Sequence, residues 1–282
     1  MSLTREDVSE GVTVFRGRYP VAGIGVTSTV ISSGDQAFVF DTLLYPEDTE
    51  ELLRSMSSMG LNPVGLINTH WHLDHTAGNQ IFFQTKRIIS HSLCIDLMHT
   101  DLPAQIEYLN KNLEEEDKVR PVYPNEIIED KSTLTVGDRE IHLLHAPGHT
   151  PDSILGYLEE ERIVIAGDTV MELPYLWYGD SQGLIDSLKR LKPIVIGKKI
   201  IQGHGVLCGS EKVDSDIGYI ESAKRLAANC IKSGKTLKEA TLEIPLDRCL
   251  PNHRFDKMPK AYNDIHLENL EKLYKEMAAR TG

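Results

Sequence analysis

The sequence has few cysteines, few aromatic residues and no long apolar run. Four cysteines are scattered through 282 residues without a Cys-x-x-Cys pair, which argues against a disulfide framework and favours reduced thiols in a cytoplasmic protein. No segment approaches the roughly 20 apolar residues of a membrane span, so no membrane contact is expected. Residues 1–7 are too polar for a signal peptide, although export of a chain trimmed of its leader is left open.

Positive charge is also scarce. Lys and Arg number 30 against 42 Asp and Glu, which gives a formal net charge of −12. Binding a phosphate backbone relies on clustered Lys and Arg, so this balance disfavours a nucleic-acid partner. Hydrophobic residues make up 40% of the chain, an ordinary value for a globular protein. The composition therefore predicts a globular protein without a nucleic-acid partner, which agrees with the small-molecule substrate expected below; a homodimer is left open.

What the sequence does contain is a dense group of metal-binding side chains. Residues 70–75 read His-Trp-His-Leu-Asp-His. Imidazole nitrogen and carboxylate oxygen are ligands that Zn²⁺ accepts, usually about four at a time and at ~2.0–2.2 Å. His70 and His72 lie two apart after an apolar run, so an extended backbone directs both the same way. Asp74 and His75 follow as the chain turns and can face a second ion, which predicts a two-metal site.

Three further candidate ligands come later, each just past an apolar segment and beside glycine. His149 lies in a Pro-Gly-His-Thr-Pro turn, Asp168 ends Ile-Val-Ile-Ala-Gly-Asp, and His204 ends Ile-Ile-Gln-Gly-His. Each pattern predicts a ligand held at a strand tip, with glycine letting the backbone approach the metals closely. The other six of the eleven histidines lack this setting and are expected to be surface or hydrogen-bonded residues.

The ordered set His-x-His-x-Asp-His, Gly-His, Gly-Asp and Gly-His resembles the metallo-β-lactamase superfamily over residues 70–205. The resemblance implies a four-layer αββα sandwich with the metals along one edge. It also implies a division of ligands between two ions: His70, His72 and His149 on one, Asp74, His75 and His204 on the other, and Asp168 as the bridge. A bridging aspartate is typical of the glyoxalase II and lactonase branches, whereas lactam-cleaving enzymes usually have cysteine or serine there.

Alternating strand and helix patterns fit this fold. The expected elements are strands at 13–15, 25–32 and 37–40, a helix from Pro46 to Gly60, a helical segment at 92–116, a second set of strands at 134–168 and a helix at 180–191. After residue 205 two longer helices, at 214–233 and 258–280, flank a loop at 245–259. We therefore expect a metallo-β-lactamase-like catalytic domain at 1–210 and a helical C-terminal extension at 211–282 packed on it.

Other residues are expected to support the site. Asp41 ends a strand pattern and is predicted to accept a hydrogen bond from a ligand and fix its orientation. Tyr175, Trp177 and Tyr178 follow Asp168 closely in a chain only 6% aromatic, and they are predicted to form a substrate wall. The segment 92–116 could supply another side of the pocket as a lid.

Two ions ~3.5–4 Å apart lower the pKa of a water between them towards ~7. The sequence therefore predicts a hydrolase of a small ester, thioester or lactone with two divalent ions, Zn²⁺ first and Fe or Mn as alternatives. Asp74 is the expected catalytic residue, orienting the nucleophile or moving its proton. Two alternatives stay open: a mononuclear iron enzyme resembling the persulfide dioxygenases, and a phosphodiesterase or nuclease of the same fold.

Overall fold

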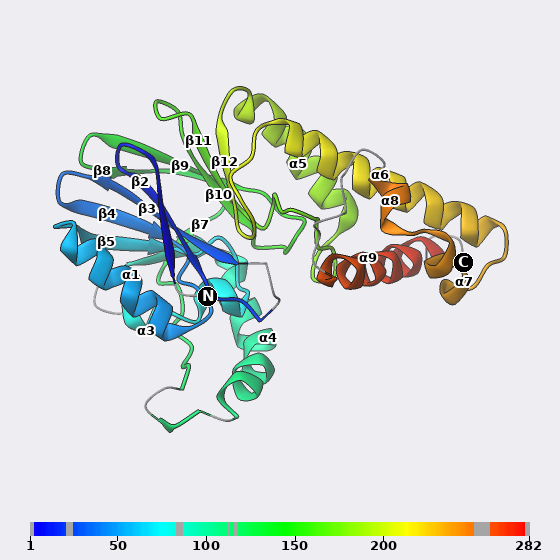
Figure 1. The fold of residues 1–282 in the computed structure, drawn as a ribbon, viewed down its shortest axis with the longest axis horizontal. Coiled ribbons are helices and arrows are strands. Elements are labelled where there is room, and N and C mark those ends of the chain that lie inside the picture. The colour runs from blue at the N-terminus through cyan, green and yellow to red at the C-terminus, as the bar shows by residue number, and fades with distance from the viewer. Residues whose placement is uncertain are drawn as a thin grey trace.

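The computed structural model describes residues 3–20, 25–82, 87–111, 113–115, 118–250 and 260–279. Two β-sheets pack face to face with helices on both outer faces, and the C-terminal helices extend from one side of this sandwich (Figure 1). The predicted four-layer αββα architecture with a helical C-terminal part is confirmed.

Each sheet combines antiparallel and parallel strands. In the described residues the first sheet runs in sequence order: β1 (Thr4–Ser9), β2 (Val12–Gly17), β3 (Val26–Ser33), β4 (Gln36–Phe40), β5 (Asn62–Ile67), β6 (Ile88–His91) and β7 (Glu126–Ile128). The second has the order β12 (Lys199–Gln202), β11 (Ile163–Gly167), β10 (Ile154–Leu158), β9 (Arg139–His145) and β8 (Lys131–Val136). The pairs β4–β5, β5–β6 and β11–β12 are parallel, so their carboxyl ends meet at common edges.

The helices form the outer layers and the C-terminal part. They are α1 (Pro46–Ser58), α2 (Leu73–Thr76), α3 (Asn79–Phe82), α4 (Ser92–Asn110), α5 (Ser181–Val195), α6 (Glu211–Lys232), α7 (Leu237–Glu243), α8 (Leu246–Cys249) and α9 (Ala261–Ala278). Helix α8 lies inside the predicted loop at 245–259, whose later part, residues 251–259, is outside the described residues. Of the helices in the described ranges, none is long and apolar enough to cross a membrane.

The period of two along β4 explains how the layers are held together. Phe38 and Phe40 point into the core between the sheets, where they pack with Ile141 of β9. Val39 points the other way and packs against Leu52 of α1. Full burial of such a side chain contributes about 1.5–3 kcal/mol. Alternate residues of β4 therefore pack into the core between the sheets and against the outer helical layer.

Helix α4 is shorter than the helical segment predicted at 92–116. It ends at Asn110, whose side chain accepts a hydrogen bond from the Val119 N–H and donates one to the Val119 carbonyl, both at 2.8 Å. This pair of contacts takes the place of a further helical turn and reverses the chain. Residues 112 and 116 of the predicted segment lie outside the described residues.

Helix α9 is fixed to the segment that follows β11. The buried Asn269 amide donates to the Pro174 carbonyl at 2.6 Å and accepts from the Leu176 N–H at 2.9 Å. Leu270 and Leu273 are buried on the same helix. A buried amide is stable only when its donors and acceptor are satisfied, so Asn269 sets the position of α9 against this segment. The division of the chain at residue 210 stays a prediction.

Candidate metal centre

The seven predicted ligands lie together at one edge of the sandwich. His70 to His75 follow β5, Asp168 follows β11, and His204 follows β12, while His149 lies in the turn between β9 and β10. All are buried except the half-buried Asp74. The strand ends thus bring together residues that are up to 134 positions apart in the chain (204 − 70).

Three imidazole nitrogens converge in the first group. Nδ1 of His72 is 2.9 Å from Nε2 of His70 and 3.1 Å from Nε2 of His149. Nitrogens that share one Zn²⁺ at ~2.0–2.1 Å must lie about this close to one another. Together with Asp168, these histidines form a group whose ligand atoms could hold an ion.

A second group lies beside the first. Oδ2 of Asp74 is 3.0 Å from Nε2 of His204 and 3.6 Å from Nε2 of His75. These three residues also satisfy the geometry of a group that could hold a metal. The site therefore offers two sets of donors, each built from side chains that the sequence had predicted.

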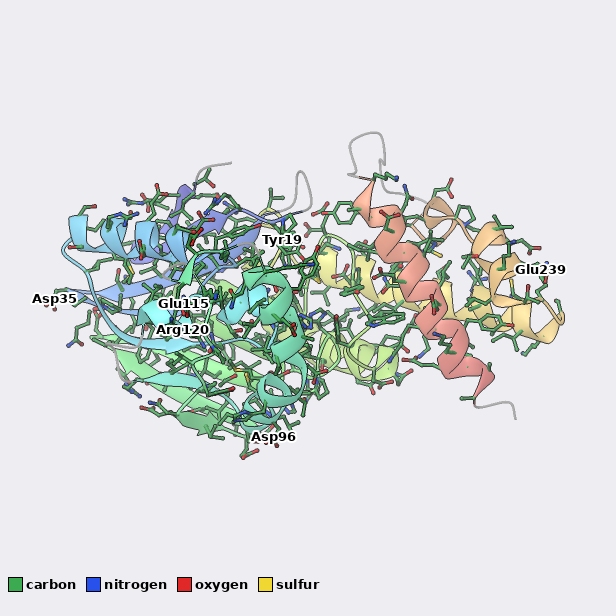
Figure 2. All side chains as sticks on the ribbon, turned by 90° about the horizontal axis from the view of Figure 1, so that it is seen from below. Tyr19, Asp35, Asp96, Glu115, Arg120 and Glu239 are labelled. Atoms are coloured by element: carbon green, nitrogen blue, oxygen red, sulfur yellow. The ribbon has the colours of Figure 1, made fainter. Side chains whose placement is uncertain are left out.

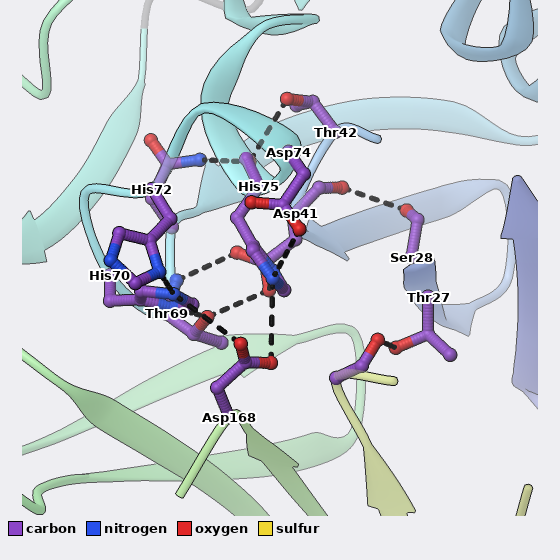
Figure 3. Close-up of polar contacts among 12 residues, drawn as sticks. Thr27, Ser28, Asp41, Thr42, Thr69, His70, His72, Asp74, His75 and Asp168 are labelled. Atoms are coloured by element: carbon purple, nitrogen blue, oxygen red, sulfur yellow. Dashed lines mark hydrogen bonds and ion pairs between the residues drawn. The ribbon is translucent and has the colours of Figure 1, made fainter. Parts of the chain in front are cut away.

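Asp168 faces both groups. Its Oδ2 is 3.4 Å from Nε2 of His149 and 3.6 Å from Nε2 of His204. Its Oδ1 is 3.4 Å from Nε2 of His75 (Figure 3). One carboxylate thus contacts members of each donor set, which is the geometry that a bridge between two ions requires.

Protonation in the first group suits metal binding. Burial, helped by the neighbouring imidazole of His75, holds the pKa of His70 well below its ordinary value. Burial and the imidazole of His149 lower the pKa of His72 to about 3, and burial also lowers the pKa of His149. A histidine binds a metal through its neutral ring, so these shifts keep the donors in the form that ligation needs.

The second group contains more negative charge. Burial works against ionisation, yet His75 and His204 lower the pKa of Asp74 to about 2. Burial also opposes a charge on His75, but Asp168 and Asp74 raise the pKa of that ring well above its ordinary value. Burial likewise opposes ionisation of Asp168, but His204 and His75 hold its pKa well below its ordinary value, so Asp74 and Asp168 are both ionised at neutral pH.

Two buried polar atoms without a hydrogen-bond partner show whether these residues fit a metal. Nε2 of His75 and Oδ1 of Asp168 are buried without a hydrogen-bond partner in the described structure. Buried polar atoms nearly always have a partner, and both atoms point into the space between the donor sets. The chemistry of the donors and these two atoms fit divalent metal ions.

Asp41 lies behind the ligands. Its Oδ2 is 2.8 Å from Nδ1 of His75 and accepts from the Thr69 hydroxyl at 2.7 Å, while its Oδ1 accepts from the Thr69 N–H at 2.8 Å (Figure 3). A carboxylate that accepts from the far nitrogen of a histidine fixes its tautomer and leaves the other nitrogen free for a metal. The structure thus brings Asp41 to the position predicted from the sequence.

Glycine is required beside Asp168. A Cβ atom on Gly203 would overlap the Asp168 carboxylate and the backbone of Gly167. The Gly203 N–H also donates to the Gly167 carbonyl at 2.8 Å, which joins the chain after β12 to the last residue of β11. The missing side chain therefore lets two ligand-bearing segments meet.

A cavity of about 400 Å³ opens in front of the metal centre. Of the predicted aromatic wall, Tyr175 and Tyr178 line it, and the ring of Tyr178 lies 4.7 Å from that of His72. Trp177 is not among the lining residues. Its ring lies under the Lys275 ammonium of α9, at 5.6 Å, because the chain between the two tyrosines turns its side chain outward.

Gln105 of α4 also lines the cavity, and it lies in the segment 92–116 that was predicted to supply another side of the pocket. Sequence reasoning missed the other lining residues, which come from three separate parts of the chain: Tyr19, Met171, Glu172, Leu173, Ala261, Tyr262, Asp264, Ile265 and Glu268. Tyr19 lies where the sandwich meets the C-terminal helices, with its ring 4.9 Å from that of His204 (Figure 2). The amphipathic pattern of α9 indicated a packed face but gave no signal that one end of the helix borders the metal centre.

Comparison with known proteins agrees with this geometry. The sequence model of the metallo-beta-lactamase superfamily matches residues 21–204. The acyl-coenzyme A thioesterase MBLAC2 of Gallus gallus is 26% identical over 263 residues, which cover 85% of this chain and 90% of the relative. The N-acyl homoserine lactonase of a Bacillus species is 28% identical over 178 residues, covering 57% of this chain and 65% of the relative.

Solved structures show the same fold. The metallo-beta-lactamase from Pontibacter korlensis gives a TM-score of 0.66 at 18% identity, covering 78% of this chain and 99% of that chain. The DIM-1 metallo-beta-lactamase gives 0.63 at 23% identity, covering 79% and 99%. The chain belongs to the metallo-beta-lactamase superfamily. It is accordingly an enzyme of the metallo-hydrolase class.

Proposed function

We propose that this enzyme hydrolyses a small ester, thioester or lactone with two divalent metal ions, and that these ions are Zn²⁺. The observation that carries the proposal is the Asp168 carboxylate, which contacts both donor sets at the floor of the cavity. One set would bind through His70, His72 and His149, and the other through Asp74, His75 and His204. Imidazole and carboxylate donors of this kind favour zinc over softer or harder ions.

The relatives support acyl-bond hydrolysis. Proteins named as an acyl-coenzyme A thioesterase and an N-acyl homoserine lactonase are among the curated proteins similar to this chain. Both names describe cleavage of an activated acyl bond by water. A cavity of about 400 Å³ with tyrosine walls suits an acyl substrate of modest size.

Bound ions of this type polarise a carbonyl oxygen and make hydroxide available at neutral pH. The side chains around them then have separate tasks. Asp74 is ionised and borders the cavity, so it can orient the attacking water and accept its proton. The charge of Asp74, then burial and Asp168, raise the pKa of Tyr19, so its phenol stays protonated and can donate a hydrogen bond to the leaving oxygen or sulfur.

A substrate panel tests the proposal. Enzyme of known metal content would be assayed with an ester, a thioester, a lactone, a lactam, a phosphodiester and structured RNA, and repeated after chelation. We expect turnover of one or more of the first three that disappears with the metals. RNA cleaved far faster than any acyl substrate would instead identify a nuclease, and oxygen consumption with a persulfide would identify an iron oxygenase.

A further inference from the structure

The ring of Tyr178 lies at the cavity, beside the first donor set. It belongs to the cavity lining, and its centre is 4.7 Å from that of His72 and 5.4 Å from that of Trp71. The residue is 41% exposed, so the part that does not pack against these two rings is free to contact a substrate. A group bound at the first donor set therefore meets an aromatic ring on this side.

Three neighbouring rings hold Tyr178 in place. Besides Trp71 and His72, the ring of Tyr175 lies 6.1 Å away, and the three meet Tyr178 edge to face at interplanar angles of 89°, 70° and 76°. Aromatic rings favour this arrangement because the positive edge of one faces the negative face of the other. Tyr175 is itself fixed, since its hydroxyl donates to Oε2 of Glu268 on α9 at 2.7 Å. The ring of Tyr178 cannot turn aside without losing these contacts.

The backbone next to this ring is joined to the turn that carries His149. A Cβ atom on Gly179 would overlap the carbonyl oxygens of Gly148 and His149, so only glycine allows this close approach. The following residue, Asp180, donates its N–H to the Gly148 carbonyl at 3.1 Å. Tyr178 therefore has a fixed position relative to a candidate ligand of the first donor set.

Other apolar parts of the lining are more adaptable. They include Met171, Ala261 and Ile265. An unbranched methionine side chain can change shape to fit a bound group, and the small side chain of Ala261 leaves room beside it. A ring that is held on several sides resists displacement, and a group too large for the space beside it would force strained side-chain conformations. The strictest limit on size is therefore expected at Tyr178.

The acyl side of the substrate is the side that meets this ring. In the proposed reaction Tyr19 donates to the leaving oxygen or sulfur, and its ring lies 4.9 Å from that of His204 in the second donor set. The leaving group is then directed toward the second donor set, and the acyl group lies toward His72 and Tyr178. The atoms next to the scissile carbonyl are thus the ones closest to the ring.

We propose that Tyr178 determines the specificity of the enzyme for the acyl group: its ring accepts an unbranched carbon next to the scissile carbonyl and excludes a branched one. The inference rests on the proposed hydrolase function and refines the substrate class of that site. Trp177 cannot have this role, because its ring lies under Lys275 of α9 and does not line the cavity. The substrate is therefore an ester, thioester or lactone that is unbranched beside its carbonyl.

The kinetic test compares the acetyl and pivaloyl thioesters of N-acetylcysteamine, which share a leaving group and differ only in the methyl groups beside the carbonyl. Pivaloyl thioesters also react more slowly in solution, so the readout is the ratio of the two kcat/KM values and its change between enzymes. Tyr178→Ala should raise the pivaloyl-to-acetyl ratio on the order of tenfold or more, because it opens space beside the carbonyl. Improved turnover of the bulky substrate cannot result from damage to the fold.

Two control variants accompany Tyr178→Ala. Tyr178→Phe keeps the ring and should keep the wild-type ratio, which separates the shape of the side chain from its hydroxyl. Trp177→Ala removes the neighbouring aromatic side chain, which does not line the cavity, and should also leave the ratio unchanged. A ratio that rises as much in Trp177→Ala as in Tyr178→Ala would overturn the inference.

A binding measurement separates this inference from the proposed function. Calorimetry of the metal-loaded enzyme would compare acetohydroxamic acid with pivalohydroxamic acid, whose hydroxamate groups bind metal ions and place the same two acyl groups at the site. Tighter binding of acetohydroxamic acid, on the order of tenfold, that is lost in Tyr178→Ala and kept in Tyr178→Phe supports the inference even if neither thioester is cleaved. Thioester cleavage with the same ratio in wild type and Tyr178→Ala, together with equal binding of the two hydroxamic acids, overturns it and leaves the hydrolase intact. Absence of both cleavage and hydroxamate binding overturns both proposals.

Discussion

Oδ2 of Asp41 lies 2.8 Å from Nδ1 of His75, and this contact ties the end of β4 to the second donor set. The same carboxylate holds the backbone N–H and the hydroxyl of Thr69, one residue before His70. One buried side chain thus supports both parts of the centre. Asp41 has a φ of 59°, a left-handed conformation that aspartate and asparagine tolerate better than most residues.

The variant Asp41→Asn should weaken metal binding by about 10–100-fold, because the amide keeps the shape and backbone conformation but loses an anionic acceptor for His75. Metal affinity would be measured by competition with a chromophoric chelator. The exposed Asp138, which accepts from Ser33, offers a control in Asp138→Asn. Unchanged affinity in Asp41→Asn would show that the hydrogen bond does not orient the ligand.

Replacing Asp74 by Asn should lower kcat by about 10²–10⁴-fold, the range expected when a positioned proton acceptor is lost. Because Asp74 also belongs to the second donor set, metal content must be measured on the same sample. A variant that kept both metals and full turnover would exclude Asp74 from proton transfer and from nucleophile orientation.

The variant Asp168→Asn should retain at most one tightly bound ion per chain, since the carboxylate contacts His149 of one set and His75 and His204 of the other. Elemental analysis after dialysis would count the ions, and anomalous scattering would locate them. Two peaks within about 4 Å are expected for the wild type. Two fully occupied ions in the variant would mean that Asp168 is not a bridge.

Gly203→Ala should disturb the metal centre through geometry alone, because its methyl group would overlap the Asp168 carboxylate. We expect reduced metal content with circular dichroism close to the wild type. Gly218 on α6 is a matched control, since a Cβ there meets no atom within 4 Å. Gly218→Ala should stabilise the fold by about 0.5–1 kcal/mol by favouring the helix. Normal metal content in Gly203→Ala would show that the backbone of Gly203 does not lie as close to the Asp168 carboxylate as described.

The buried carboxyl of Asp216 should make the free energy of unfolding depend on pH. It is buried on α6, and burial, only partly offset by Lys212, raises its pKa from 3.8 to about 7. Between about pH 4 and pH 7 the folded state keeps a proton that the unfolded state releases, so the free energy of unfolding falls as pH rises, at a slope of up to about 1.4 kcal/mol per pH unit.

Asp216→Asn removes this titration, so denaturant unfolding of the two proteins should show a difference that changes steadily across that window. The free energies of unfolding of the wild type and the variant are subtracted because metal binding contributes its own pH dependence to both proteins. A difference that stays constant between pH 4 and pH 7 would show that the Asp216 pKa is not raised in the folded state.

The candidate ligands could be predicted because each is marked locally. His70, Asp168 and His204 come within three residues of the ends of apolar segments that form strands, and strand ends in a sandwich meet at common edges. The resemblance then supplied the pairing of ligands, which spacing alone does not determine. The strand predicted at 37–40 likewise appears as β4, at Gln36–Phe40.

The cavity wall could not be predicted in the same way. Which of three neighbouring aromatics faces the metals depends on the turn of an irregular segment, and Trp177 lies instead against Lys275. The end of α4 at Asn110 depends on side-chain contacts with Val119, nine residues later. Glu268 reaches the site only through the docking of α9, which is set by the buried amide of Asn269. Such contacts between distant segments have no local signature.

Asn269 anchors α9 at a position where the first turns of this helix line the cavity. The last candidate ligand is His204, whereas Asp264 and Glu268 lie 60 or more positions further along the chain. This part of the cavity wall is therefore encoded apart from all seven candidate ligands, unlike the wall residues Met171 and Leu173. Substitutions in the first turns of α9 can change this part of the wall while they leave the candidate metal ligands untouched, so we expect proteins with this architecture to differ in substrate through their C-terminal helices.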